Sequence, residues 1–263
     1  MLRRSLAAVA ALAVLTALSS TSAFAQGAKK LRIGVEGAYP PFSEVGADGK
    51  LKGFEIDLAY AYCKQMQREC ELVQQEFDAL IPALQSRKVD AIIASVSITD
   101  ERKKSIAFSK PYLASPAAFI AKSGAAADVS PATLKGKKIG VQSATTFEKY
   151  VDALYKTSTV TRYQTQDQIY LELKAGRVDY TLVDKFAADA FLKTDAGKGL
   201  AFAGKDIDDE KFFGIGIGVG LRKAEAGTLG KAFDAAIDAL NANGEYKKLS
   251  AKYFAYDVAP KKK

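Results

Sequence analysis

The sequence predicts an α/β protein made of two Rossmann-like lobes that are joined by two crossover strands. After Gln26, short apolar runs alternate with stretches of helical periodicity, which is typical of parallel sheets covered by helices. The same pattern starts again at Lys137, so each lobe has about 100 residues, an ordinary domain size. Two extended segments of alternating hydrophobicity, 111–124 and 211–223, connect one lobe with the other.

The first lobe begins with an apolar run, and its elements follow in the order strand, helix, strand, helix, strand. A turn at Asp48-Gly49 precedes the first helix, in which Phe54, Ile56 and Leu58 recur at roughly helical spacing. The predicted strands cover 31–36, 70–75 and 89–96, and the predicted helices cover 53–66 and 78–86.

The second lobe repeats this order and, like the first, contains a late strand that begins with Val-Asp. Its predicted strands cover 137–143, 160–166 and 178–184, and its predicted helices cover 145–156, 167–176 and 185–194.

The C-terminal part, 229–254, is predicted as two helices separated by Asn243-Gly244. Because the chain crosses between the lobes twice, these helices should pack on the first lobe. The first lobe then comprises 26–115 and 215–263, and the second comprises 116–214. The glycine-rich stretch 214–220 lacks the G-x-G-x-x-G spacing of a nucleotide-binding loop, so its alternating pattern favours a strand.

The N-terminus has the layout of a secretory signal peptide. Arg3 and Arg4 precede an apolar stretch from Leu6 to Leu18, and small residues lead to Ala25. The stretch is shorter than the roughly 20 apolar residues that span a bilayer, which argues against a membrane anchor. We expect residues 1–25 to be removed after Ala25 and the remaining chain to reside in the periplasm.

Composition excludes several classes of function. The chain has no histidine, which removes Ser-His-Asp and Cys-His catalysis and the usual zinc sites, so we expect no catalytic residue, metal or cofactor. The net charge is +8, but apart from Lys261–Lys263 the basic residues are scattered. Nucleic acid requires a concentrated positive patch and is therefore not an expected partner.

The two cysteines, Cys63 and Cys70, are the only ones in the chain. On one continuous helix they would lie about 10 Å apart along the axis, beyond the reach of a disulfide. A disulfide is favoured in an exported protein and requires the helix to end near Gln67 or Arg68. Two free thiols are the alternative.

A binding site for an anion is predicted where the strand 89–96 ends. Ser97 and Thr99 lie at the start of a helix, whose free N–H groups attract negative charge. Arg102 in the first turn would be unfavourable there by itself, but its planar guanidinium can bind two oxygens of one carboxylate. The alternative is a surface arginine paired with Asp100 or Glu101.

The second lobe offers polar groups at matching positions. A strand ends near Gln142, and Ser143 and Thr146 follow at the start of a helix. Asp184 ends another strand and either caps the next helix or accepts hydrogen bonds from an ammonium group. Groups for a carboxylate and for an ammonium together describe the backbone of an α-amino acid.

The side chain of such a ligand would lie near three residues of the first lobe. Glu36 ends the first strand, where its carboxylate suits a cationic side chain. Tyr39 and Phe77 supply aromatic faces that can enclose an alkyl chain or a planar cation. Ordinary packing within the lobe is the alternative for these rings.

The chain resembles the family 3 periplasmic solute-binding proteins of amino-acid ABC importers, and within them the lysine/arginine/ornithine and histidine binders. The resemblance covers nearly the whole chain after the leader and follows the family's order, in the stretches "LRIGVEGAYPPF", "GFEIDLAYAYC", "DALIPALQSRKVDAIIASVSITDERKKSIAFSKPY", "LKGKKIGVQSATT", "AGRVDYTLVD", "FGIGIGVGLRK" and "KKLSAKYF". It implies a type II periplasmic binding protein fold, a monomer, and an ABC permease of the inner membrane as partner.

The resemblance also implies roles for individual residues. Arg102, Ser97 and Thr146 would hold the ligand's α-carboxylate. Asp184, with a backbone carbonyl near Ser95, would hold the α-ammonium. Tyr39 and Phe77 would stack on the side chain, and Cys63 and Cys70 match a disulfide of the basic amino-acid binders.

This sequence departs from the family pattern at three positions. Glu36 stands where Asp is usual, Ala94 where Ser is usual, and Phe147 where Gln is common. An L-amino acid, with a basic side chain, is the expected ligand. The alternatives are an opine such as octopine or nopaline, an arogenate or prephenate dehydratase with Glu36 as general acid, and the ligand-sensing part of a receptor.

Overall fold

The computed structural model describes residues 30–260. The predicted signal peptide and its cleavage site after Ala25 lie outside the described residues. Within the described part of the chain, no helix combines the length and the apolar character that crossing a bilayer requires.

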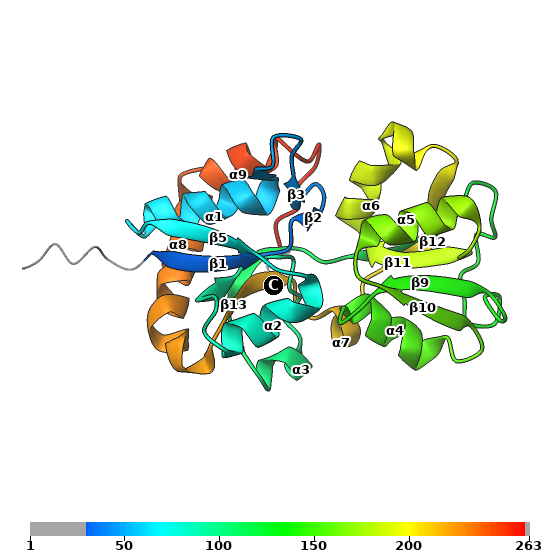
Figure 1. Ribbon diagram of the computed structural model, residues 1–263, viewed down its shortest axis with the longest axis horizontal. Helices are drawn as coiled ribbons and strands as arrows, with labels where there is room; N and C mark the ends of the chain where they lie inside the picture. Colours follow the sequence, from blue (N-terminus) through cyan, green and yellow to red (C-terminus); the bar gives the residue numbers. More distant parts are fainter. Residues whose placement is uncertain (1–29, 261–263) are drawn as a thin grey trace, which may run out of the picture. The chain divides into compact units, whose positions relative to one another are not determined.

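The first sheet has five strands in the order β5-β1-β6-β13-β7 (Figure 1). Its first three strands are parallel, and β13 is antiparallel to both of its neighbours. The strands are β1 (Leu31–Val35), β5 (Cys70–Gln74), β6 (Ala91–Ile92), β7 (Ala107–Leu113) and β13 (Ile217–Leu221). We call this sheet with its helices the first lobe.

Helices cover both faces of this sheet. Aromatic and aliphatic side chains of α1 (Phe54–Gln65), α8 (Lys231–Ala242) and α9 (Glu245–Ser250) form one core with the sheet. On the other face α2 (Phe77–Gln85) packs so closely that a Cβ atom at Gly34 would lie 3.1 Å from Leu80 Cδ2. The short α3 (Asp100–Lys103) follows β6. The C-terminal helices therefore return to the first lobe as predicted, and Gly244 between them has φ +77°.

The second sheet has the order β10-β9-β11-β8-β12, and we call it with its helices the second lobe. Its strands are β8 (Ala117–Lys122), β9 (Lys138–Gln142), β10 (Thr159–Tyr163), β11 (Tyr180–Asp184) and β12 (Leu200–Ile207). The strands β10, β9 and β11 are parallel, whereas β8 is antiparallel to both β11 and β12.

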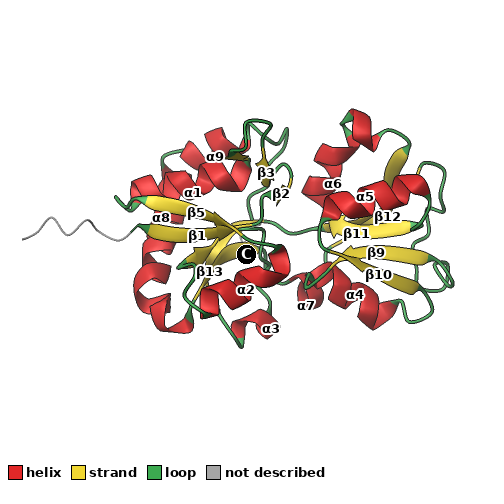
Figure 2. Ribbon diagram, viewed as in Figure 1, coloured by secondary structure: helices red, strands yellow, loops and turns green. Residues whose placement is uncertain are grey.

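The helices of the second lobe also lie on two faces of their sheet (Figure 2). α5 (Gln166–Ala175) and α6 (Lys185–Leu192) pack on one face, and α4 (Thr146–Leu154) and α7 (Glu210–Phe213) on the other. The arrangement agrees with the predicted α/β fold of two Rossmann-like lobes. Short 3-10 turns at Asp195–Gly197 and Lys223–Glu225 and a π-turn at Ala226–Gly230 complete the helical elements.

Two crossovers connect the sheets. The first is the short link 114–116 between β7 and β8. The second runs from β12 through α7 and the glycines before β13, where Gly214 has φ +74° and a Cβ atom would lie 2.0 Å from the carbonyl oxygen of Ile98. The extended segment predicted over 211–223 is therefore wrong in its first part, because Glu210–Phe213 is helical and the strand begins at Ile217.

Three further elements differ from the prediction. The predicted strand 89–96 pairs only at Ala91–Ile92, and the chain then bends at Ser95, whose φ is +51°. Strand β12 is not predicted from the sequence. Neither is a small antiparallel sheet of β2 (Ala38–Tyr39), β3 (Ser43–Val45) and β4 (Leu51–Lys52).

The C-terminal segment after α9 contacts both lobes. The carbonyl oxygen of Val258 accepts a hydrogen bond from Ala114 N in the first crossover at 2.9 Å. Tyr256 donates from its hydroxyl to Asp189 Oδ2 of α6 at 2.9 Å. The ring of Phe254 lies 5.4 Å from that of Phe54 in the first lobe and 6.1 Å from that of Phe186 in the second.

The predicted disulfide between Cys63 and Cys70 is confirmed. α1 ends at Gln65, and Gln67 has φ +53°, which turns the chain back toward β5. The two Cα atoms are thereby 6.1 Å apart, within the range for a disulfide.

Candidate functional site

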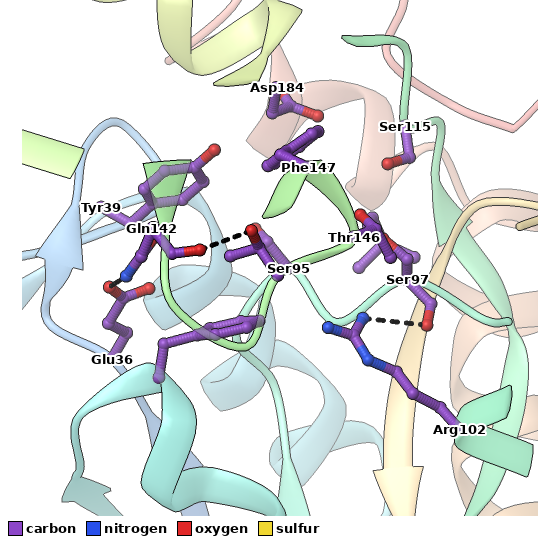
Figure 3. A pocket seen from close by; sticks show the side chains of 13 residues that line it. Glu36, Tyr39, Ser95, Ser97, Arg102, Ser115, Gln142, Thr146, Phe147 and Asp184 are labelled. Atoms are coloured by element: carbon purple, nitrogen blue, oxygen red, sulfur yellow. Dashed lines mark hydrogen bonds between the residues drawn. The ribbon is translucent and has the colours of Figure 1, made fainter. Parts of the chain in front are cut away.

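A polar pocket lies between residues of both lobes (Figure 3). Several of its residues end a strand or begin the following helix, which is where open α/β sheets bind ligands. From the first lobe and its crossovers come Glu36, Tyr39, Phe77, Ser95, Ser97, Arg102, Ser115 and Ile217, and from the second come Gln142, Thr145, Thr146, Phe147 and Asp184.

Arg102 brings a buried cation to this pocket. Thr99 caps α3 and accepts from Arg102 N at 3.2 Å, so the arginine sits in the first turn as predicted. Its side chain is buried, and it donates to Ser97 O at 3.2 Å and, from the first lobe to the second, to Ala144 O at 3.1 Å. The guanidinium also lies 5.7 Å from the ring centroid of Phe77.

The charge of Arg102 has no acidic partner within 4 Å among residues 30–260. The predicted alternative of a surface pair with Asp100 or Glu101 is therefore not observed; Asp100 pairs with Lys103, and Glu101 pairs with Lys149. Burial lowers the pKa of Arg102 to about 10, which still leaves it charged at neutral pH. A buried cation held only by carbonyl oxygens lacks compensation and favours an anion beside it.

The N-terminus of α4 faces the same pocket. Thr145 caps the helix, accepting from Glu148 N at 3.1 Å while donating to Gln142 O at 2.7 Å. Thr146 is the first helical residue. The residue is largely buried, and its hydroxyl makes no hydrogen bond with any described residue. A free hydroxyl beside free N–H groups provides donors for a carboxylate.

Asp184 both caps a helix and lines the pocket. It caps α6, because its Oδ1 atom accepts from Phe186 N at 2.8 Å and from Ala187 N at 3.2 Å. It also lines the pocket, where its Oδ2 atom has no hydrogen-bond partner among the described residues. Burial raises the pKa of Asp184 to about 7, and the two helix N–H groups oppose that rise.

Glu36 is a second buried acid in the pocket. Its Oε1 atom accepts a hydrogen bond of 2.6 Å from Nε2 of Gln142, which also donates to Gln164 O at 2.9 Å. Burial raises the pKa of Glu36 to about 8, the Gln142 bond opposes this, and the negative charge of Glu55 adds to it. A cation placed beside Glu36 would reverse the effect and favour its charged form.

Two buried hydroxyl groups in the pocket have no partner among the described residues, those of Tyr39 and Ser115. Buried polar groups are normally satisfied, so each such group needs an explanation. A polar ligand that fills the pocket would provide one. The ring of Tyr39 stacks on Phe42 with centroids 5.7 Å apart, which shows that the tyrosine serves both the core and the pocket.

The structure brings nine of the eleven predicted ligand-binding residues to the pocket lining: Glu36, Tyr39, Phe77, Ser95, Ser97, Arg102, Gln142, Thr146 and Asp184. Ala94 and Ser143 are not in the lining. The Ala94 side chain points into the core under α2, and Ser143 N donates to Tyr163 O at 3.0 Å.

Four lining residues are absent from the predicted set: Ser115, Thr145, Phe147 and Ile217. Thr145 and Phe147 flank the predicted Thr146, so their positions in the sequence could have indicated that they line the pocket. Ser115 belongs to the first crossover and Ile217 is the first residue of β13, and they line the pocket only because the two lobes meet there.

Two α/β lobes, joined by two crossovers and holding a pocket with a buried cation and buried acids between them, define a two-lobed solute-binding protein. The family model for bacterial extracellular solute-binding proteins, family 3, matches residues 31–256. The chain belongs to this family.

Curated relatives agree with this assignment. The chain is 48% identical over 233 residues to an L-arginine-binding protein of Pseudomonas aeruginosa, covering 88% of this chain and 90% of the relative. It is 43% identical over 254 residues to the lysine/arginine/ornithine-binding periplasmic protein of Escherichia coli, covering 95% and 97%.

Solved structures share the fold. A periplasmic binding protein of Salmonella typhimurium with high arginine specificity matches with a TM-score of 0.80 and 34% identity, over 87% of this chain and all of the other. An ancestral amino acid-binding protein, a precursor of cyclohexadienyl dehydratase, matches with a TM-score of 0.76 and 28% identity, over 86% and 95%.

Proposed function

We propose that this protein captures an L-amino acid with a cationic side chain, such as arginine, lysine, ornithine or histidine, and delivers it to an ABC permease of the inner membrane. The observation that carries the proposal is the pairing of opposite groups in one pocket. Arg102 is a buried cation without an acidic partner, and Asp184 and Glu36 are buried acids without a basic one, among the described residues.

The α-carboxylate of the ligand would lie between Arg102 and the start of α4. The Arg102 guanidinium supplies charge, and Ser97 and the free hydroxyl of Thr146 supply neighbouring polar groups. Since Arg102 belongs to the first lobe and Thr146 to the second, one carboxylate contacts both. Such a bridge stabilises the closed arrangement of the lobes selectively, which is the requirement for a ligand to drive closure.

The α-ammonium would lie at the free Oδ2 atom of Asp184, with Ser95 nearby. The cationic side chain would extend toward Glu36, past Tyr39 and Phe77. The two curated relatives bind arginine or the group lysine, arginine and ornithine, which supports a cationic side chain in the ligand.

The protein would work outside the cytoplasm as a monomer without a metal, cofactor or catalytic residue. We propose cleavage after Ala25 and rigid movement of the lobes 26–115 with 215–263 against 116–214. The periplasmic relatives support the location. Four hydrogen-bonded or ionic contacts between the lobes, Arg102–Ala144, Gln142–Glu36, Lys149–Glu101 and Tyr256–Asp189, support a closing motion.

A dehydratase is the second candidate, because one solved relative is a precursor of such an enzyme and because Glu36, with a pKa of about 8, holds a proton at neutral pH. Calorimetric titration with the twenty amino acids, octopine and nopaline tests the main proposal, with arogenate and prephenate turnover followed in parallel. We expect basic L-amino acids to bind best and no phenylalanine to form. Preference for acidic or apolar amino acids would contradict the role of Glu36, and turnover would establish the enzyme.

A further inference from the structure

One buried carboxylate lies beside the pocket without lining it. Glu55 is in the first turn of α1 and is only 1% exposed. Its Oε1 atom accepts from Ser95 N at 2.7 Å, and its Oε2 atom accepts from Ser95 Oγ at 3.0 Å. The hydroxyl of Tyr112 donates to Oε1 as a third partner. A buried acid with three donors is fixed in one position.

The residue that Glu55 holds has an unusual backbone. Ser95 has φ +51°, in the left-handed region that residues other than glycine, asparagine and aspartate rarely adopt. It lies three residues after the end of β6 and interrupts what the sequence predicts to be a longer strand. Hydrogen bonds from both its backbone N–H and its side chain to one carboxylate explain why a serine keeps this conformation.

The same bonds determine which atom of Ser95 remains available. The residue has two donors, N–H and Oγ–H, and both are bound to Glu55. Its carbonyl oxygen accepts no hydrogen bond from any described residue, and Ser95 lines the pocket. Because Glu55 occupies both hydrogen-bond donors of Ser95, the Ser95 carbonyl oxygen remains available as an acceptor.

Glu55 is itself anchored in the first lobe. The carbonyl oxygen of Tyr112 accepts from the Tyr246 hydroxyl at 2.6 Å, which connects β7 with α9. Burial raises the pKa of Glu55 itself, and the hydrogen bonds from Tyr112 and Ser95 oppose that rise. In its charged form Glu55 also raises the pKa of both Glu36 and Asp184. An acceptor with a negative charge behind it favours a positively charged donor.

We propose that Glu55 is a positioning residue for the ligand's α-ammonium: it holds Ser95 in the left-handed conformation, takes up both donors of Ser95, and leaves the Ser95 carbonyl as an acceptor for the ammonium beside Asp184. This inference rests on the proposed function, because it assumes a ligand with an α-ammonium. It does not place Glu55 in contact with the ligand.

The test compares ligands with and without the ammonium. L-arginine is paired with 5-guanidinopentanoate, and L-lysine with 6-aminohexanoate, which lack only the α-amino group. We expect Glu55→Ala to weaken binding of both amino acids about 30-fold, which is the range for losing a buried polar arrangement, and to weaken binding of the analogues less than about threefold. Asp57→Ala, which removes another first-turn acid of α1, is the matched control and should leave all four affinities unchanged.

Two further variants separate positioning from folding. Glu55→Gln keeps an acceptor for Ser95 N and Tyr112, so it should lose less than about fivefold in affinity for the amino acids. Adding Ser95→Gly to Glu55→Ala should restore part of the lost affinity, about fivefold, because glycine adopts positive φ freely and has no hydroxyl donor.

A crystal structure of ligand-free Glu55→Ala gives a readout that needs no ligand, and it also applies if Glu55→Ala binds nothing. We expect Ser95 to leave the left-handed region; if its φ stays near +51°, the proposal is overturned. Equal loss for amino acids and analogues would also overturn it, because that would indicate general damage. If wild-type protein binds neither amino acid, the proposed function fails instead.

Discussion

Glu36 and Gln142 belong to different lobes, and Nε2 of Gln142 donates to Oε1 of Glu36 at 2.6 Å. The bond occupies the acid that would meet a ligand's cationic side chain. Gln142 keeps a second acceptor, Gln164 O at 2.9 Å, within its own lobe. A ligand can therefore take over part of Glu36 while Gln142 remains hydrogen-bonded.

Binding of a cationic amino acid should release protons near neutral pH. Glu36, with a pKa of about 8, is protonated in the empty pocket, and a neighbouring cation lowers that pKa. The affinity for arginine or lysine should therefore rise as the pH rises from about 6 to about 8, by up to about tenfold per pH unit for each proton released.

Calorimetry in buffers of different ionisation enthalpy measures this release. Glu36→Gln should reduce the number of protons released and shift preference toward neutral amino acids. The same proton count in Glu36→Gln and wild type would show that another group, such as Asp184, accounts for the effect.

Replacing Arg102 should remove binding of every amino acid, whatever its side chain. Arg102→Ala takes away the only charge proposed for the α-carboxylate, and we expect a loss of at least about 100-fold, consistent with breaking a buried charge pair. Arg102→Lys keeps the charge but not the planar guanidinium, so its affinity should lie between those of the wild type and Arg102→Ala. Titration calorimetry with a basic and a neutral amino acid checks this; unchanged affinity in Arg102→Ala would exclude the carboxylate site.

Substitutions of Asp184 can separate its role as the cap of α6 from its proposed role in binding the ligand. In Asp184→Asn the side-chain oxygen can still accept from Phe186 N and Ala187 N, so the cap is kept while the charge is lost. We expect this variant to retain its melting temperature within a few degrees and to lose at least about tenfold in affinity. Asp184→Ala should also lose stability, by about 1 kcal/mol. Thermal unfolding beside calorimetry distinguishes the two; full affinity in Asp184→Asn would contradict the ammonium site.

The ligand-free protein should become less stable as the pH rises from about 5 to about 8. Both Glu36 and Asp184 have a pKa raised by burial, so the folded state binds more protons than the unfolded state in this range. Stability then falls with increasing pH, opposite to an acid in a salt bridge. Thermal melts without ligand measure the slope. Glu36→Gln should flatten it, and a wild-type slope of zero or of opposite sign would contradict the burial argument.

The disulfide should contribute to stability and not to binding. Cys63 and Cys70 are seven residues apart in sequence, and closing so short a loop stabilises a protein by about 2.5 kcal/mol in the chain-entropy account. We expect Cys63→Ser with Cys70→Ser to lower the denaturant midpoint and to leave the affinity for the amino acid within about twofold. A large change in affinity at full folding would show that the end of α1 is coupled to the pocket.

Much of the candidate site could be predicted because it follows a topological rule. Arg102 lies in the short helix that follows β6, and Asp184 is the last residue of β11. In open α/β sheets ligand-binding groups lie at such ends of parallel strands, and the chemistry of both residues differs from what capping alone requires. Ser115 and Ile217 could not be predicted in this way. Ser115 is a small residue of the first crossover and Ile217 an apolar residue at the start of β13, and they line the pocket only because the lobes approach each other.

The fold could be predicted where hydrophobic periodicity is strong. Strand β12 was not predicted because most of its eight residues are at least partly exposed, so its sequence pattern resembles that of a polar loop. Strand β6 was predicted too long because Ile93, Ala94 and Val96 are buried like strand residues, although the chain bends at Ser95, whose φ is +51°. Glu55 fits the periodicity of its helix as a first-turn acid, and its contact with Ser95, forty residues away, depends on tertiary structure.

The segment after α9 contacts both lobes, in addition to the two crossovers that join them. Val258 is hydrogen-bonded to the first crossover and Tyr256 to α6, so this segment connects the first crossover with the second lobe. Anyone who shortens this protein, or fuses a fluorophore or a second domain to it for a biosensor, should cut after Val258. A cut directly after α9 would remove the contacts of Val258 and Tyr256, and we expect it to change the response of the sensor.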